Sequence, residues 1–144
     1  MFSDSLLQLE RNHLFSIAIW AHASVLAGTI LLVWLARRGD RSPLLFHFAV
    51  QTAAWGACAV AFAALRWHGL GMRDLAAATR LDHQLWLATG LDLGAIGVGV
   101  TLAITAWRLD RRVGPVGAGL GIILQGAALA VLDARFLAQL QGLV

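Results

Sequence analysis

Residues 116–140 read VGAGLGIILQGAALAVLDARFLAQL, and this run decides the fold. It contains two charged side chains, Asp133 and Arg135, both in its second half. The hydrocarbon core of a bilayer is about 30 Å thick, so a helix that rises about 1.5 Å per residue needs about 20 mostly apolar residues to cross it. The run meets this requirement and predicts a membrane-spanning helix.

Three earlier stretches have the same character, at about 13–36, 44–65 and 85–107. The composition agrees with them, because 59% of the 144 residues are hydrophobic, 13% are charged and the mean hydropathy is +0.73. A water-soluble domain of this size could not bury so much apolar surface. We therefore expect an all-α fold, in which residues 1–144 form a single transmembrane domain, a four-transmembrane-helix bundle.

The segments between the spans predict how the helices connect. Residues 37–43 and 108–115 each combine Arg with Gly and Pro, which is typical of tight turns, so the spans should form two antiparallel hairpins. The middle connection, residues 66–82, is longer and includes an amphipathic stretch at 72–80. This stretch predicts either a short interfacial helix or an extension of the third span.

The two hairpins also show a weak pseudo-repeat. When the sequence is aligned with itself so that position 13 meets position 83, His13 aligns with His83 and Arg38 aligns with Arg108. Some transporters are built from such parallel repeats. Any two membrane hairpins with Arg-rich turns would align about as well, so both interpretations stay open.

The arginines predict the orientation. The two turns hold six of the eleven basic residues, all of which are Arg, and positive charge in short loops stays on the cytoplasmic side. We expect a multi-pass protein of the bacterial cytoplasmic (inner) membrane with both termini facing out. The bilayer is the expected partner, and nucleic acid is not, because no basic stripe with stacking aromatic residues accompanies the charge.

Polar residues inside the spans mark the expected buried network. Counted from the arginine turns at about 1.5 Å per residue, His22, Asp92 and Gln125 lie at similar depths of roughly 20 to 24 Å, and Gln51 lies nearer the midplane. Ionisable groups in a span cost about 2.5 to 3.5 kcal/mol on insertion scales, so they should face the bundle interior. We expect Asp92, Gln125, His22, Gln51 and Asp133 to form an interhelical polar network.

Two functions are compatible with such a network. The leading hypothesis is a non-enzymatic structural or accessory subunit, which forms a homo-oligomer or joins a larger membrane complex and uses the network as an interhelical clamp. The alternative is a small proton-coupled transporter or carrier in which His22 and Asp92 relay protons. No phosphate-binding loop or nucleophile motif indicates an enzyme.

A second polar layer lies at the outer rim. Glu10 and His13 are three residues apart on one helix face, and His83 lies at a similar level in the third span. Imidazole and carboxylate groups from neighbouring helices could bind zinc or copper in a metal or redox module. Interfacial hydrogen bonding is the other interpretation of this layer, and we expect no other cofactor.

Two motifs resemble a known family. The sequence GLDLG at 90–94 and the sequence QGAALAVLD at 125–133 are similar to the signatures of a family of small bacterial four-helix integral membrane proteins, a domain of unknown function. Members pair a Gly-Leu-Asp-x-Gly helix with a Gln-Gly-x-x-Leu-x-x-x-Asp helix. The resemblance implies a four-helix membrane fold, carries no activity over, and points to Asp92, Gln125 and Asp133 as the residues to test.

The first hairpin matches the family less closely. Trp20 and Trp55 correspond to the tryptophans that members carry in the first two spans. Members have Asn after these tryptophans, whereas this chain has His22 or Ser24 in the first span. The resemblance therefore carries no polar role over to the first hairpin.

Overall fold

A computed structural model describes residues 2–39 and 41–143, so Asp40 in the first turn lies outside the described residues. Within these residues, the elements in chain order are four helices: α1 (Phe2–Arg38), α2 (Pro43–His68), α3 (Leu75–Asp110) and α4 (Val113–Gln141). Each is long and apolar enough to cross a membrane. The prediction of an all-α protein with four candidate membrane spans is confirmed.

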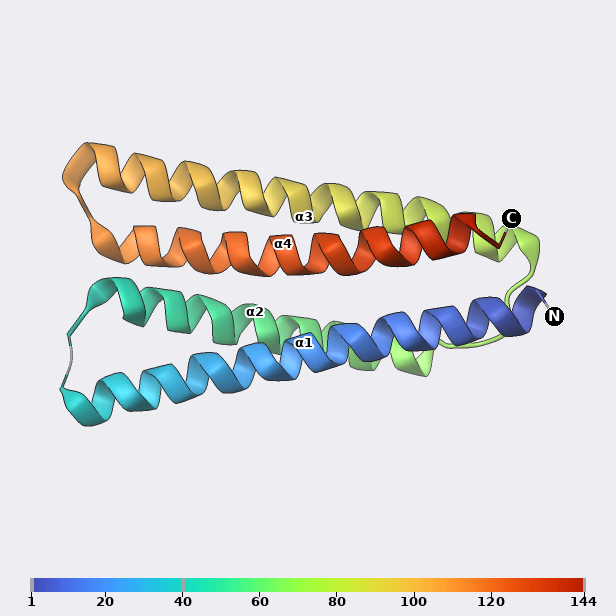
Figure 1. Cartoon of the computed structure of the whole chain (residues 1–144), viewed down its shortest axis with the longest axis horizontal. Helices are drawn as coiled ribbons and strands as arrows, with labels where there is room; N and C mark the ends of the chain where they lie inside the picture. The colour runs from blue at the N-terminus through green and yellow to red at the C-terminus, as the bar shows by residue number, and fades with distance from the viewer. Residues whose placement is uncertain (1, 40, 144) are drawn as a thin grey trace.

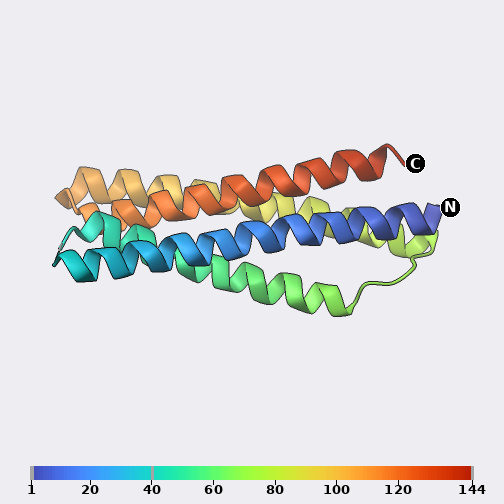
Figure 2. The ribbon, with the colours of Figure 1, turned by 60° about the horizontal axis from the view of Figure 1, so that its bottom comes forward.

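The helices form two hairpins that lie side by side (Figure 1). α1 packs along α2, α3 packs along α4, and the hairpins meet mainly through α2 and α4. The turns between α1 and α2 and between α3 and α4 lie at one end, and both chain termini lie at the other (Figures 1 and 2). We call these the turn end and the terminal end.

The middle connection extends the third span. α3 begins at Leu75, because the Asp74 side chain accepts a hydrogen bond from the backbone N–H of Ala77 at 2.7 Å and caps the helix. Most of the amphipathic stretch at 72–80 is therefore the first part of α3. Of the two expectations for this stretch, the extension is the one that the structure bears out.

Glycines allow α4 to approach its neighbouring helices α2 and α3 closely. A Cβ atom at Gly117 of α4 would meet the backbone of Leu44 in α2, and a Cβ atom at Gly119 would lie 2.5 Å from the carbonyl oxygen of Gly99 in α3. Only hydrogen fits at these two positions. α4 therefore uses neighbouring glycines to contact α2 and α3 at backbone distance.

Two helices are longer than the membrane requires. α1 has 37 residues and α3 has 36, which corresponds to about 55 Å each, whereas the hydrocarbon core is about 30 Å thick. Trp34 and Trp107 lie next to the turns, where interfacial tryptophans belong. The excess length therefore lies at the terminal end, which reaches the headgroup region and beyond.

The terminal end has a small hydrophobic core of its own. Its buried members come from α1, α3 and α4 and are Leu6, Ala78, Leu81, Leu85, Phe136, Leu137 and Leu140. This cluster lies next to the charged rim of the bundle, where water or lipid headgroups are available to solvate neighbouring ions. The two features together indicate that the terminal end packs like a soluble helix bundle rather than like a lipid-embedded one.

Candidate functional site

Gln125 is the centre of a polar network within the membrane. It is 1% exposed, its Oε1 atom accepts a hydrogen bond from Trp20 Nε1 at 2.9 Å, and its Nε2 atom donates to Ser24 Oγ at 3.1 Å. The bonds connect α4 to α1, a pair of helices that otherwise pack less closely than the hairpin partners. Gln125 thus ties the second hairpin to the first through side chains.

Replacing Gln125 with leucine is expected to destabilise the bundle by about 1 kcal/mol, since hydrogen bonds between membrane helices contribute roughly 0.6 kcal/mol on average. Ser24→Ala should cost less, because the Trp20 bond remains. The free energy of unfolding in mixed-detergent titrations measures both changes. Equal stability of Gln125→Leu and the parent protein would show that these hydrogen bonds do not stabilise the contact between α1 and α4.

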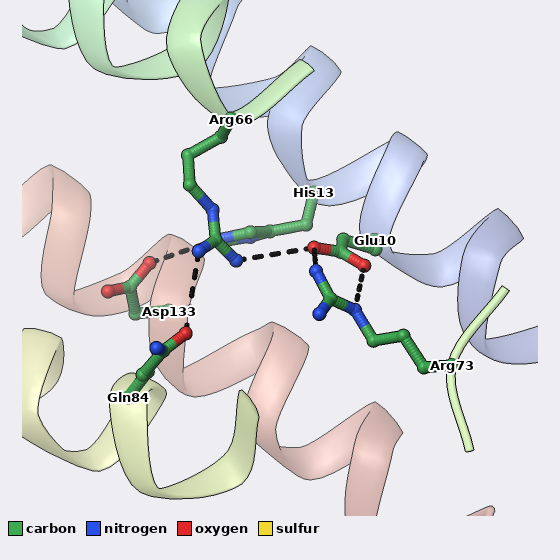
Figure 3. Close-up of polar contacts among 6 residues, drawn as sticks. All are labelled: Glu10, His13, Arg66, Arg73, Gln84 and Asp133. Carbon is green, nitrogen blue, oxygen red and sulfur yellow. Dashed lines mark hydrogen bonds and ion pairs between the residues drawn. The ribbon is translucent and has the colours of Figure 1, made fainter. Parts of the chain in front are cut away.

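A second cluster, the rim cluster, lies at the terminal end and is centred on Glu10 (Figure 3). Glu10 is 2% exposed. Arg73 donates to both of its carboxylate oxygens, from Nε at 2.8 Å and from Nη2 at 2.7 Å, and Arg66 Nη2 donates at 3.3 Å. A bidentate pair with one further arginine satisfies the buried carboxylate, as burial of a charge requires.

The position of Arg73 explains its role. It lies in the connection between α2 and α3, and the hydrogen bonds to Glu10 raise the pKa of its guanidinium above the ordinary value. Arg73 therefore stays charged, and its contact holds the long connection against α1. Arg66 adds α2 to the cluster and also donates to Gln84 Oε1 of α3 at 3.4 Å.

His13 and Asp133 complete the rim cluster. His13 Nε2 lies 3.2 Å from Asp133 Oδ1, and each side chain is 9% exposed. The imidazole also stacks on Phe136, with ring centroids 4.4 Å apart. With Glu10, Arg66, Arg73 and Gln84, these residues bring all four helices and the connecting segment together in one polar cluster (Figure 3).

A cavity of about 250 Å³ lies beside the rim cluster. All four helices contribute to its wall, and its polar lining residues are Glu10, His13, Arg66, Gln84 and Asp133. The rest of the wall is apolar, including Phe62 and Leu91. The cavity is large enough for several water molecules, which occupy about 30 Å³ each in the liquid.

Asp92 lies next to this cavity. The side chain is partly buried, and its Oδ2 atom is buried without a hydrogen-bond partner among residues 2–39 and 41–143. Its helix neighbours Ala88 and Leu91 line the cavity, and so does Asp133 of α4. One carboxyl oxygen of Asp92 is therefore enclosed by the bundle, without a hydrogen-bond donor among the described residues.

The structure does not bring His22 to Asp92. His22 is exposed, and its Nδ1 atom donates to the backbone oxygen of Ala18 at 2.7 Å, one turn earlier in α1. Ala21 and Ser24 are the residues that face inward at this level. The local hydrogen bond satisfies the imidazole on the outer face, so the expected His22–Asp92 pair is absent from the described part of the chain.

The other expected members of the network are also separate. Gln51 is partly buried and packs against Gly121, where a Cβ atom would lie 2.9 Å from its own Cβ. No hydrogen bond joins Gln51 to Gln125 among the described residues. Asp133 belongs to the rim cluster instead. The single polar network expected from the sequence is thus two clusters, one around Gln125 and one around Glu10.

The three residues of the expected metal site do not converge. Glu10 and His13 both line the cavity, but Glu10 binds two arginines and His83 is exposed. Across residues 2–39 and 41–143, no group of three or more His, Cys, Asp or Glu residues is arranged to hold a metal ion. Glu10 and His13 therefore take part in ion pairs of the rim cluster, and His83 lies on the exposed surface of α3.

Sequence reasoning missed several partners in both clusters. Trp20 looks like a packing residue in the sequence, yet its indole N–H binds Gln125. Ser24 gives the first hairpin the polar role that the family resemblance did not carry over. Arg73 lies 63 positions from Glu10, and no local pattern connects the two. For Gln84, the only feature in the sequence that could have predicted its place in the rim cluster is its polar side chain.

The fold and the two clusters define a small multi-pass membrane protein of four helices. Residues 16–134 match the sequence profile of a family of unknown function, DUF6992, and the chain belongs to this family. The match covers most of α1, all of α2 and α3, and most of α4. No curated protein and no solved structure gives a significant match.

Proposed function

We propose that this protein is a non-enzymatic structural or accessory subunit of a membrane assembly, located in the cytoplasmic membrane with both termini facing out. One observation carries the proposal: the polar side chains that converge between the helices bind one another. Gln125 binds Trp20 and Ser24, and Glu10 binds two arginines. Groups engaged in this way stabilise a scaffold and are not free to bind a substrate.

The outer face of α3 supports the assembly role. α3 is the least buried of the four helices. A Cβ atom at Gly90, Gly94 or Gly97 would meet no atom within 4 Å. These glycines lie on a membrane-facing helix where another helix could approach closely.

Light scattering of the protein extracted from native membranes in a mild detergent tests the proposal. We expect an assembly of fixed stoichiometry, either several copies of this chain or this chain with another membrane protein. A monodisperse single chain without a stoichiometric partner, in two or more mild detergents, would contradict the role of a subunit.

The cavity favours a second candidate, a proton-coupled carrier that works through Asp92 and Asp133 rather than through His22. Asp92 has a buried oxygen without a hydrogen-bond partner in the described residues, and Asp133 with His13 lines the neighbouring cavity. A carboxyl group that can take up and release a proton beside such a cavity is what a proton pathway requires.

Asp92→Asn separates the two candidates. The amide has nearly the same shape as the carboxyl group but cannot exchange a proton at this site. If the protein is a carrier, pH-driven flux into proteoliposomes should be present in the parent and abolished in Asp92→Asn, with the thermal midpoint unchanged. If it is a scaffold, the parent protein should show no flux above empty liposomes.

A further inference from the structure

The arginines at the turn end are exposed and outnumber the acidic residues in the two turns. All six side chains are exposed on the surface of the bundle: Arg37, Arg38, Arg41, Arg108, Arg111 and Arg112. The sequence of the two turns also contains two acidic residues, Asp40 and Asp110. Six positive and two negative charges give the turn end a formal charge of +4. The rest of the chain has five Arg and six Asp or Glu, which sum to −1.

The terminal end carries a more balanced set of charges, and several of them form ion pairs. Glu10 binds Arg66 and Arg73, and Asp133 binds His13. The net charge of +3 for the whole chain is therefore the sum of +4 at the turn end and −1 for the rest. A charge asymmetry of this kind creates a positive potential at one membrane interface only.

Two tryptophans place the arginines at the depth of lipid headgroups. The Arg38 guanidinium lies 4.8 Å from the ring centroid of Trp34, and the Arg111 guanidinium lies 5.4 Å from that of Trp107. Tryptophans at the ends of membrane spans occupy the interface, so guanidinium groups stacked on them lie next to phosphates.

The starts of α2 and α4 lie beside these arginines. Neither helix has an acidic residue in its first turn, and a helix N-terminus carries roughly half a positive charge. The two starts are adjacent, because a Cβ atom at Gly114 would lie 2.8 Å from His47 Cδ2 and 3.6 Å from Pro43 Cβ. The C-terminal ends of α1 and α3 lie at the same end and offset these two helix dipoles, so the positive potential of this surface comes from the arginines.

We propose that the turn end is a docking surface for anionic phospholipids, whose headgroup phosphates bind the exposed arginines beside the paired starts of α2 and α4. Guanidinium groups bind phosphate oxygens through two parallel hydrogen bonds. The surface selects lipids by charge, so phosphatidylglycerol binds and phosphatidylcholine does not. This inference is independent of the proposed assembly role.

Native mass spectrometry of the purified protein in a neutral detergent tests the proposal, with phosphatidylglycerol and phosphatidylcholine of matched acyl chains as probes. The parent protein should retain phosphatidylglycerol preferentially. Each basic residue near a lipid surface contributes about a fivefold gain in affinity, so R37Q/R108Q should weaken phosphatidylglycerol binding about 25-fold. The second pair, R38Q/R111Q, should give a similar loss.

The matched control is R80Q/R135Q, which removes two exposed arginines from the terminal end. Its affinity for phosphatidylglycerol should stay within about twofold of the parent value, because the screening length near 0.1 M salt is about 10 Å and the two ends are much farther apart. An equal loss in this control, or equal retention of phosphatidylcholine, would overturn the proposal. If inorganic phosphate at the same concentration displaces the bound lipid, the surface is a phosphate site and the lipid assignment is wrong.

Discussion

Gly117→Ala is expected to lower the free energy of unfolding by about 2 to 3 kcal/mol, one of the two largest effects that the structure predicts. The new methyl group would meet the backbone oxygen and carbonyl carbon of Leu44 in α2. Backbone atoms cannot rotate away as a flexible side chain would, so α4 has to move away from α2. Inserting one methyl group into a tightly packed interface typically costs about 1 to 3 kcal/mol.

Gly94→Ala is the matched control for this prediction. The substitution is the same and the residue also lies within a membrane helix, but a Cβ atom at Gly94 meets no atom within 4 Å. Alanine favours the helix over glycine by up to about 1 kcal/mol, so the stability of this variant should be unchanged or higher. Unfolding titrations of both variants as single chains, in one detergent that dissociates any assembly through the α3 face, measure the difference. Similar stabilities would mean that the hairpins do not meet at Gly117.

The fold could be predicted from the sequence because the bilayer leaves few alternatives. An apolar run such as 116–140 has to satisfy its backbone hydrogen bonds internally, so it forms a helix whatever its neighbours are. The charged turns at 37–43 and 108–115 then require antiparallel hairpins. The lengths of α1 and α3 exceeded the expected spans, because hydropathy marks the lipid-embedded part of a helix and not its end.

The partners of the polar residues could not be predicted in the same way. α1 is apolar on most of its surface, so helical spacing alone did not show that Ser24 faces inward and His22 faces outward. A histidine that binds the carbonyl oxygen of its own helix needs no partner from another helix. Gln125 was predicted correctly as a buried residue, since glycine and alanine share its helix face, but its partners required the packing of α1 against α4.

The rim cluster depends even more on the tertiary structure. Arg73 reaches Glu10 only because the connection between α2 and α3 runs back along α1, and composition does not determine the path of a loop. The long helices provide the physical reason for this cluster. About 27 residues separate Glu10 from the turn end of α1, which corresponds to about 40 Å, so the carboxylate lies outside the hydrocarbon core.

Glu10→Gln should therefore lower the free energy of unfolding by about 2 to 3 kcal/mol, comparable to the effect of Gly117→Ala. Removing one partner of a buried ion pair typically costs about 3 to 5 kcal/mol, because the other charge is left unpaired. Side chains of Arg73 and Arg66 remain 23% and 33% exposed, so solvent reduces the penalty. Glutamine keeps one oxygen acceptor, so part of the hydrogen bonding to the arginines remains, but its NH2 group cannot accept the hydrogen bonds made to the second carboxylate oxygen.

A double-mutant cycle with Arg73→Gln isolates the pair from general effects on the helix. If Glu10 and Arg73 stabilise the fold through each other, the double variant should be less destabilised than the sum of the two single variants, by about 1 to 2 kcal/mol. Arg80→Gln is the control, since Arg80 is an exposed arginine at the same end. Its change should add to that of Glu10→Gln. Additive effects for Arg73 as well would mean that the connection between α2 and α3 is not held against α1 by this ion pair.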